Sequence, residues 1–240
     1  MWNNAWFITK YELKRSGWGT LASVAIYLYF GSFSGFLVNA LVQKGLEEAQ
    51  GALLVPTDVL FLIAMSCIAF SFTGDYTKYY QNDIFSRRLI YMKQLPISLQ
   101  EIVMARYVQL AFTTLIQGIL FFIPFAFLSR VNELLPVGSF LGFMVMWVCF
   151  GLCFGVVFAY KELGGNGKSY LWFSIIATFV LLAAALLSGL SGFSLVEMTI
   201  KVSSWYGGVI LAPAFLFTIV WGRLWFGWTV LKIKNRSFVR

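Results

Sequence analysis

Residues 73–106 read TGDYTKYYQNDIFSRRLIYMKQLPISLQEIVMAR and form the only long polar segment of a very apolar chain. The segment lies between two hydrophobic stretches and carries five cations, which are Lys78, Arg87, Arg88, Lys93 and Arg106. Phe85, Leu89 and Met92 recur at helical spacing, which predicts a short amphipathic helix with these three side chains on one side. Arg87, Arg88 and Tyr91 then point elsewhere. We call residues 73–106 the elbow.

The elbow contains start and stop signals for two helices. Asn82 and Asp83 are candidate N-caps of the amphipathic helix, because their short polar side chains can accept from free backbone amides. Pro96 ends that helix, since proline lacks a backbone donor and clashes with the preceding turn. Ser98 and Glu101 form an S-x-x-E capping box that starts the next helix. The elbow is therefore expected to be a folded cytoplasmic segment to which another protein can bind.

The composition places the chain in a membrane. Hydrophobic residues make up 60% of the 240 residues and charged residues only 12%, too few to cover the surface of a soluble domain. Long apolar runs recur along the chain, so an all-α integral membrane protein is expected. The net charge of +8 is explained by membrane topology, and no nucleic-acid partner is expected.

Six membrane spans are predicted, over residues 19–42, 59–72, 107–129, 137–160, 170–187 and 209–231. The second apolar core is about 21 Å long at 1.5 Å per residue, short of the roughly 30 Å hydrocarbon layer. Its helix must therefore begin earlier, near Leu53, or continue past Thr73. Residues 43–58, 130–136 and 161–169 are expected to be loops.

Two further segments complete a single transmembrane domain over residues 1–240. Residues 1–18 are amphipathic, with Trp2, Trp6, Thr9 and Leu13 on one stripe, and predict an uncleaved helix in the headgroup layer. Residues 188–208 begin with a helix-breaking cluster of Ser and Gly. They are too polar to span and too apolar for an ordinary loop, so interfacial or re-entrant helical pieces are expected on the outer side.

The distribution of Lys and Arg predicts the orientation. With the N-terminus inside, the inner segments hold 14 Lys and Arg residues and the outer loops only 3, while Arg223 lies within the last span. This bias agrees with the positive-inside rule and predicts that both termini are cytoplasmic.

No catalytic, metal or nucleotide site is expected in this chain. Histidine is absent, which excludes His-based proteases, haem ligation and proton relays. Cys67, Cys149 and Cys153 lie in apolar runs and are expected to act as small hydrophobic residues. Residues 164–169, GGNGKS, resemble part of a P-loop, but Glu162 stands where its first glycine is required, so a flexible inner loop is expected.

Polar residues inside the spans are candidates for a substrate path. Asp and Glu are absent near the middle of the predicted spans, which disfavours an ion-coupled carrier. The uncharged candidates are Asn39, Ser66, Thr113, Thr114 and Gln117, although such residues more often serve helix packing. Arg223 lies in the inward half of the sixth span and either contacts substrate or snorkels to the cytoplasmic headgroups among tryptophans.

The elbow resembles a segment of the membrane subunits of ABC-2 type transporters. The resemblance rests on Leu95-Pro96-Ile97-Ser98, then Glu101-Ile102 and Ala105-Arg106, and extends to the layout of the whole chain. It implies a bacterial cytoplasmic-membrane exporter in which the elbow helix is a coupling helix that docks on a separate ATPase. We expect the ATPase contact at Phe85, Arg87, Arg88, Leu89, Met92, Lys93 and Pro96. The alternative is a surface helix that binds anionic lipid.

The same resemblance implies the partners and the cargo. Two membrane subunits, favoured as two copies of this chain, would assemble with two ATPases, and ATP and Mg would bind to the ATPase and not to this chain. Export of an amphipathic peptide, such as a toxin or antimicrobial, is the leading expectation. The alternatives are export of a lipid, glycan or drug and, from other classes, an ion-coupled carrier or a membrane-embedded enzyme.

Overall fold

The computed structural model describes residues 2–15, 17–43, 51–70 and 83–236, and these residues contain helices and no strand. The expectation of an all-α architecture is confirmed. The elements are α1 (Trp2–Arg15), α2 (Trp18–Gln43), α3 (Gly51–Ser66), α5 (Ile84–Gln94), α6 (Leu99–Ser129), α7 (Val131–Leu134), α8 (Val137–Gly164), α9 (Gly167–Leu190), α10 (Leu195–Tyr206), η1 (Gly207–Ile210) and α11 (Leu211–Lys234).

Five helical stretches of the described chain are long and apolar enough to cross a membrane. They are Trp18–Gln43, Leu99–Ser129, Val137–Gly164, Gly167–Leu190 and Leu195–Lys234. The second predicted span corresponds to α3, which has only 16 residues and measures about 24 Å, less than the roughly 30 Å hydrocarbon layer. It begins at Gly51, close to the expected start at Leu53. The alternative, a helix that continues past Thr73, is wrong, because α3 ends at Ser66 and residues 67–69 form a turn.

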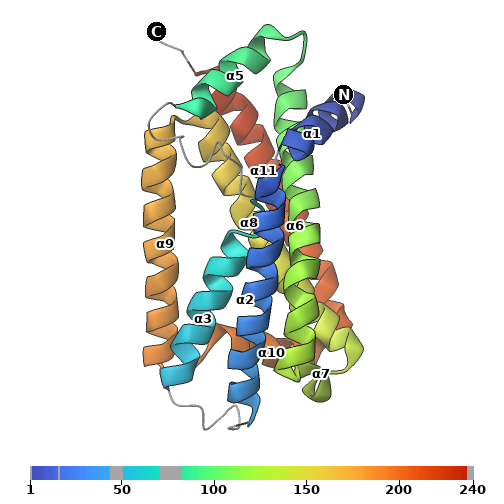
Figure 1. Ribbon diagram of the computed structural model, residues 1–240, viewed down its shortest axis with the longest axis vertical. Helices are drawn as coiled ribbons and strands as arrows, with labels where there is room; N and C mark the ends of the chain where they lie inside the picture. Colours follow the sequence, from blue (N-terminus) through green and yellow to red (C-terminus); the bar gives the residue numbers. More distant parts are fainter. Residues whose placement is uncertain (1, 16, 44–50, 71–82, 237–240) are drawn as a thin grey trace.

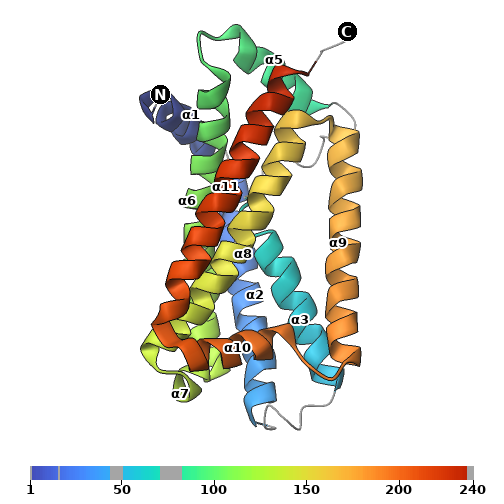
Figure 2. The same ribbon diagram turned by 180° about the vertical axis from the view of Figure 1, so that it is seen from behind.

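The long helices form a bundle with two distinct ends (Figures 1 and 2). At one end lie α1, α5 and the last turn of α11, and we call it the α5 end. At the other lie α7 and α10, and α10 crosses the ends of its neighbours instead of running along them (Figure 2). We call this the α10 end.

Glycines allow α2 and α6 to pack closely. The two helices run in the same direction. A Cβ atom at Gly31 would overlap the carbonyl oxygen of Phe121, and one at Gly35 would lie 2.9 Å from the Cβ atom of Leu128. The G-x-x-x-G spacing puts both glycines on one face of α2, which lets the two backbones touch.

Aromatic side chains fill the core where α3, α6 and α8 meet. The buried Phe61 of α3 contacts the rings of Phe121 and Phe125 of α6, with centroids 5.5 and 5.4 Å away. The ring of Trp147 of α8 lies 5.1 Å from Phe61. Edge-to-face and tilted ring contacts of this kind contribute about 0.5–1.5 kcal/mol each beyond area burial. The dense phenylalanines of the sequence thus pack this core as well as facing outward.

Two helices extend past the predicted spans into polar residues. α6 begins at Leu99, where the capping box predicts its start, although the predicted span begins only at residue 107, and α8 continues to Gly164 beyond the predicted end at residue 160. The expected loop at 161–169 shrinks to Gly165 and Asn166, between two capped helices. Asp58, expected in a loop, lies inside α3 and is fully buried. Charged residues end apolar runs without ending helices, so hydropathy alone misplaced these limits.

Asp58 holds α10 at its end of the bundle. Its two carboxylate oxygens accept hydrogen bonds from the Ser188 and Ser194 hydroxyls, at 3.0 and 2.5 Å. They also accept from the backbone amides of Leu195 and Val196, at 2.7 and 3.0 Å. A carboxylate at a helix N-terminus accepts hydrogen bonds from the free amides and interacts favourably with the positive end of the helix dipole. Residues 188–208 are therefore largely helical, with α9 reaching Leu190 and α10 anchored by Asp58.

Candidate functional site

The candidate site lies at the α5 end and begins with the way α5 is seated. Phe85 and Leu89 are buried, whereas Tyr91 is 65% exposed, so the predicted two-sided character of this helix is confirmed. The Phe85 ring lies 5.1 Å from the ring of Tyr170 in α9. Leu89 packs in a small core with Ile102 of α6 and Ile233 of α11. These apolar contacts fix one face of α5 against the bundle.

The capping box predicted at the start of α6 is confirmed. The Ser98 hydroxyl accepts from the Glu101 amide at 3.2 Å, and the Glu101 carboxylate accepts from the Ser98 amide at 2.9 Å. The side chain of Asn4 also donates to Glu101, at 3.0 Å. The first turn of α6 is thereby rigid and is tied to α1.

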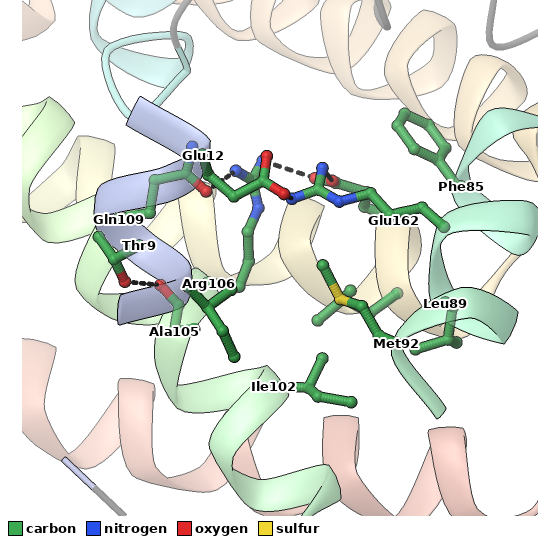
Figure 3. Close-up of a pocket in the computed structure, with 13 residues that line it drawn as sticks. Thr9, Glu12, Phe85, Leu89, Met92, Ile102, Ala105, Arg106, Gln109 and Glu162 are labelled. Atoms are coloured by element: carbon green, nitrogen blue, oxygen red, sulfur yellow. Dashed lines mark hydrogen bonds and ion pairs between the residues drawn. The ribbon is translucent and has the colours of Figure 1, made fainter. Parts of the chain in front are cut away.

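Four charged side chains meet beside α5, and we call them the ionic junction (Figure 3). Arg88 of α5 lies 2.8 Å from Glu12 of α1 and 4.0 Å from Glu162 of α8. Arg106 of α6 lies 2.6 Å from the second carboxylate oxygen of Glu162. Arg106 also donates to the side-chain oxygen of Gln109, at 2.8 Å. Four helices that are separate in sequence are therefore joined through two acids and two bases.

The ionic junction is shielded from water, which makes it sensitive to change. The side chains of Glu162 and Arg106 are 3% and 8% exposed, and those of Glu12 and Arg88 are 10% and 21% exposed. Removal of one partner from such a buried pair leaves an uncompensated charge and costs about 3–5 kcal/mol. Charge-assisted bonds also fix direction, so the junction sets how α5 lies against α1, α6 and α8.

A small hollow of ≈20 Å³ lies at the ionic junction, among Thr9, Glu12, Arg88, Arg106 and Glu162. This volume suits about one water molecule, given that a site needs roughly 10–15 Å³ for each. The Thr9 hydroxyl donates to the Ala105 carbonyl at 2.9 Å and closes one side (Figure 3). The buried face of α1 is therefore Ala5, Thr9 and Glu12. Of the predicted stripe, Thr9 packs against the bundle while Trp2 and Trp6 are exposed, and the position of α1 in the headgroup layer stays a prediction.

Two further contacts lock the ends of α5. Asp83 holds the N-cap position, but its side chain does not cap α5. It instead accepts from the Gly167 amide at 2.9 Å and so helps to start α9. Lys93 donates to the Ile233 carbonyl at 3.0 Å, a favourable place for a cation at the C-terminus of α11. Burial, and then the nearby Arg236 charge, lowers the pKa of Lys93.

Arg236, which lies just beyond α11 near the end of the chain, bridges to α5 and α8. It donates to the Leu163 carbonyl at 3.1 Å and to the Ser86 hydroxyl. Burial also lowers its pKa, and the Asp83 charge opposes this shift. The sequence alone does not indicate a structural role for Arg236, Glu12 or Glu162. All three residues lie near the predicted inner side of the membrane, where opposite charges from different helices can meet. This shared position is the sequence feature that could have indicated their pairing.

The predicted ATPase-contact residues divide between the two faces of α5. Phe85 and Leu89 are buried, Arg88 belongs to the ionic junction, and Met92 and Lys93 are half-buried. Only Arg87 and Pro96 of that set are exposed. Ile90, Tyr91 and Leu95 are also exposed, so the free face of α5 is mixed basic, aromatic and aliphatic.

The predicted substrate-path residues lie on four helices, α2, α3, α6 and α11. Thr113, Thr114 and Gln117 are buried in α6, and the Gln117 amide donates to the Phe70 carbonyl at 3.0 Å. Ser66 lies at the end of α3, and Asn39 of α2 accepts from Gln43 at 3.4 Å. Arg223 is exposed near the middle of α11. The role of these positions in a substrate path stays a prediction.

The glycine-rich segment at 164–169 serves a helix start. The Asn166 side chain accepts from the Ser169 amide at 2.8 Å, and the Gly167 amide is bound to Asp83. Two amides that a phosphate would use are therefore occupied. Among the described residues, no three His, Cys, Asp or Glu side chains lie close enough to hold a metal ion. Cys67, Cys149 and Cys153, which all lie in the described part of the chain, are free thiols.

No protein-family model and no curated protein matches this chain. The ABC-2 resemblance therefore stays a prediction from the residues of the elbow.

Proposed function

We propose that this chain is the membrane-spanning subunit of an ATP-driven exporter of the ABC-2 type, and that a separate ATPase docks on the exposed face of α5. The observation that carries this proposal is the ionic junction. It joins α5 to α1, α6 and α8, while Lys93 joins α5 to α11. Because α5 is joined to four other helices, a force applied to α5 moves these helices with it and is not absorbed by α5 alone.

The geometry supports a lever made of α5 and α6. Only Leu95, Pro96, Ile97 and Ser98 separate the two helices, and the capping box starts α6 without slack. The 31 residues of α6 extend about 46 Å at 1.5 Å per residue. Movement of α5 on a closing ATPase would tilt α6 directly, and the ionic junction would carry the same movement to α8.

The other parts of the proposal follow the charge bias and the family layout. The α5 end faces the cytoplasm of a bacterium, where the ATPase holds ATP and Mg, and both termini lie on this side. A second copy of the chain completes the transporter. The cargo is an amphipathic compound, and a peptide is favoured. These statements rest on the positive-inside count and the elbow motif.

Co-purification with a co-expressed candidate ABC ATPase tests the docking surface. Reversal of charge and loss of the ring, in Arg87→Glu with Tyr91→Ala, is expected to weaken the complex about tenfold or more, because exposed Arg and Tyr dominate interface energy. Lys10→Glu is the matched control, since Lys10 is equally basic and exposed but lies in α1. Equal binding by all three proteins, with full peptide-stimulated ATP turnover, would refute the assignment.

A further inference from the structure

A second hollow lies away from the ionic junction, in the space between α9 and its neighbours α2, α3 and α8. It measures ≈220 Å³ and we call it the α9 pocket. Its lining residues are Tyr27, Ser66, Cys67, Phe70, Phe158, Tyr170, Ser174, Ala177, Thr178 and Leu181. The pocket exists because α3 ends at Ser66 and turns at residues 67–69, so this helix does not accompany α9 along its whole length.

The walls of the α9 pocket are apolar in chemistry. None of the ten lining residues carries a formal charge. Three of its five hydroxyls are used locally, since Ser66 donates to the Ile63 carbonyl at 3.0 Å, Ser174 to the Tyr170 carbonyl at 2.8 Å and Thr178 to the Ser174 carbonyl at 2.9 Å. Serine and threonine in membrane helices commonly bond in this way to their own backbone. The surface offered to a ligand is therefore aromatic and aliphatic.

Aromatic rings form the inner wall. Phe70 and Phe158 lie with ring centroids 5.3 Å apart, and Phe158 lies 5.8 Å from Tyr170. These edge-to-face contacts brace the rings against one another, so the wall does not collapse easily into the space. An apolar cavity of about 150 Å³ is already enough to bind benzene. The α9 pocket is larger and therefore has room for an aliphatic segment.

The pocket is continuous with the outer apolar surface of α9. Thr178 lines the pocket and is itself exposed, and the next residues, Phe179 and Val180, are exposed apolar side chains. In a spanning helix, side chains of this kind face lipid. With α9 in a membrane, this side of the pocket borders the hydrocarbon layer.

We infer that the α9 pocket binds one acyl chain of a bilayer lipid. An uncharged, ring-lined hollow that opens sideways to lipid selects an alkyl chain, because such a chain fills the space without leaving a polar group unpaired. The inference goes beyond the proposed transport function, since it requires no ATPase and no cargo. Its test can fail while the docking of the ATPase stands, and the reverse also holds.

Photo-crosslinking in nanodiscs tests this inference on the full-length chain. The probe is phosphatidylglycerol with a diazirine at the middle of one acyl chain, diluted in phosphatidylglycerol and phosphatidylethanolamine. In the unaltered protein, crosslinked peptides are expected to cluster at residues 66–70 and 174–181. Ala177→Trp fills the pocket from α9 and is expected to lower this labelling about tenfold, a change equal to ~1.4 kcal/mol.

The matched control is Ala183→Trp, which places the same ring on an exposed position of α9. It is expected to keep the labelling at residues 66–70. Elution as one species and an unchanged thermal unfolding midpoint verify that both variants fold. Labelling spread evenly over the exposed faces of α9 and α11 in the unaltered protein would overturn the inference. So would a pocket that is labelled by a diazirine-bearing amphipathic peptide and not by the lipid.

Discussion

Arg106 and Glu162 are 56 residues apart in the chain, yet the arginine Nη2 atom lies 2.6 Å from a carboxylate oxygen of Glu162. Both side chains are buried, and together they join the start of α6 to the end of α8. Arg88 of α5 approaches the other oxygen of the same carboxylate, at 4.0 Å. Glu162, in α8, therefore connects α8 to both α5 and α6.

Glu162→Gln is expected to destabilise the protein by about 3–5 kcal/mol, because Arg106 would keep its charge in a dry site without a counter-charge. Unfolding in mixed micelles with increasing SDS measures this loss. Glu133→Gln is the control, since Glu133 is exposed in α7, and it should leave the transition unchanged. Equal midpoints for both variants would mean that Glu162 contributes no net stability.

A pairwise replacement tests whether charge or shape holds the ionic junction. Arg106→Met combined with Glu162→Met removes both charges and keeps most of the volume. Apolar replacements of complete buried pairs are often neutral or stabilising, so the double variant is expected to unfold later than Glu162→Gln. If the double variant is the less stable of the two, the hydrogen bond of Arg106 to Gln109 and the ion pair of Glu162 with Arg88 dominate instead.

Local features of the elbow could be predicted because they depend on neighbouring residues. The capping box needs only Ser98 and Glu101, and it forms as expected. The inward face of α5 follows from the helical spacing of Phe85 and Leu89. The apolar runs also predict the long helices, since length and hydropathy suffice for that.

Tertiary partners could not be predicted in the same way. Asp83 has the composition of an N-cap, but a left-handed backbone (φ 42°) turns its side chain to the start of α9. Asp58 appears loop-like because it follows polar residues, yet it caps α10 from inside α3. Arg88 looks like a surface cation until Glu12 and Glu162 are placed beside it. Each error concerns a charge whose partner is far away in sequence.

Asp58→Ala is expected to release the N-terminus of α10 at a cost of about 3 kcal/mol, because the buried hydroxyl and amide donors lose a charged acceptor. Ser194→Ala removes one of these bonds and the side-chain cap at Glu197, for which a loss of about 1 kcal/mol is expected. Hydrogen exchange of the amides at residues 195–206 measures the release. Exchange that is no faster in Asp58→Ala than in Ser194→Ala would contradict the role given to Asp58.

Two glycine substitutions should change stability in opposite directions. Gly31→Ala puts a methyl group into the Phe121 carbonyl oxygen, so α2 and α6 must separate. Gly227→Ala meets no atom within 4 Å and gains about 1 kcal/mol of helix propensity. SDS unfolding should therefore move to lower SDS for the first variant and to higher SDS for the second. A shift of the same sign for both would show that this contact is loose.

Arg88→Met is expected to weaken the coupling of α5 to the other helices while the ATPase still docks. The side chain points into the ionic junction, beside Glu12 and Glu162, so its loss is expected to change ATPase affinity by less than about twofold. Transmission from α5 to α8 weakens, and peptide-stimulated ATP turnover of the purified complex should fall several-fold. Arg87→Glu, on the exposed face, should have the opposite pattern, with lost binding. If Arg88→Met releases the ATPase as strongly as Arg87→Glu does, Arg88 is itself a contact residue, and α5 must rotate when the ATPase binds.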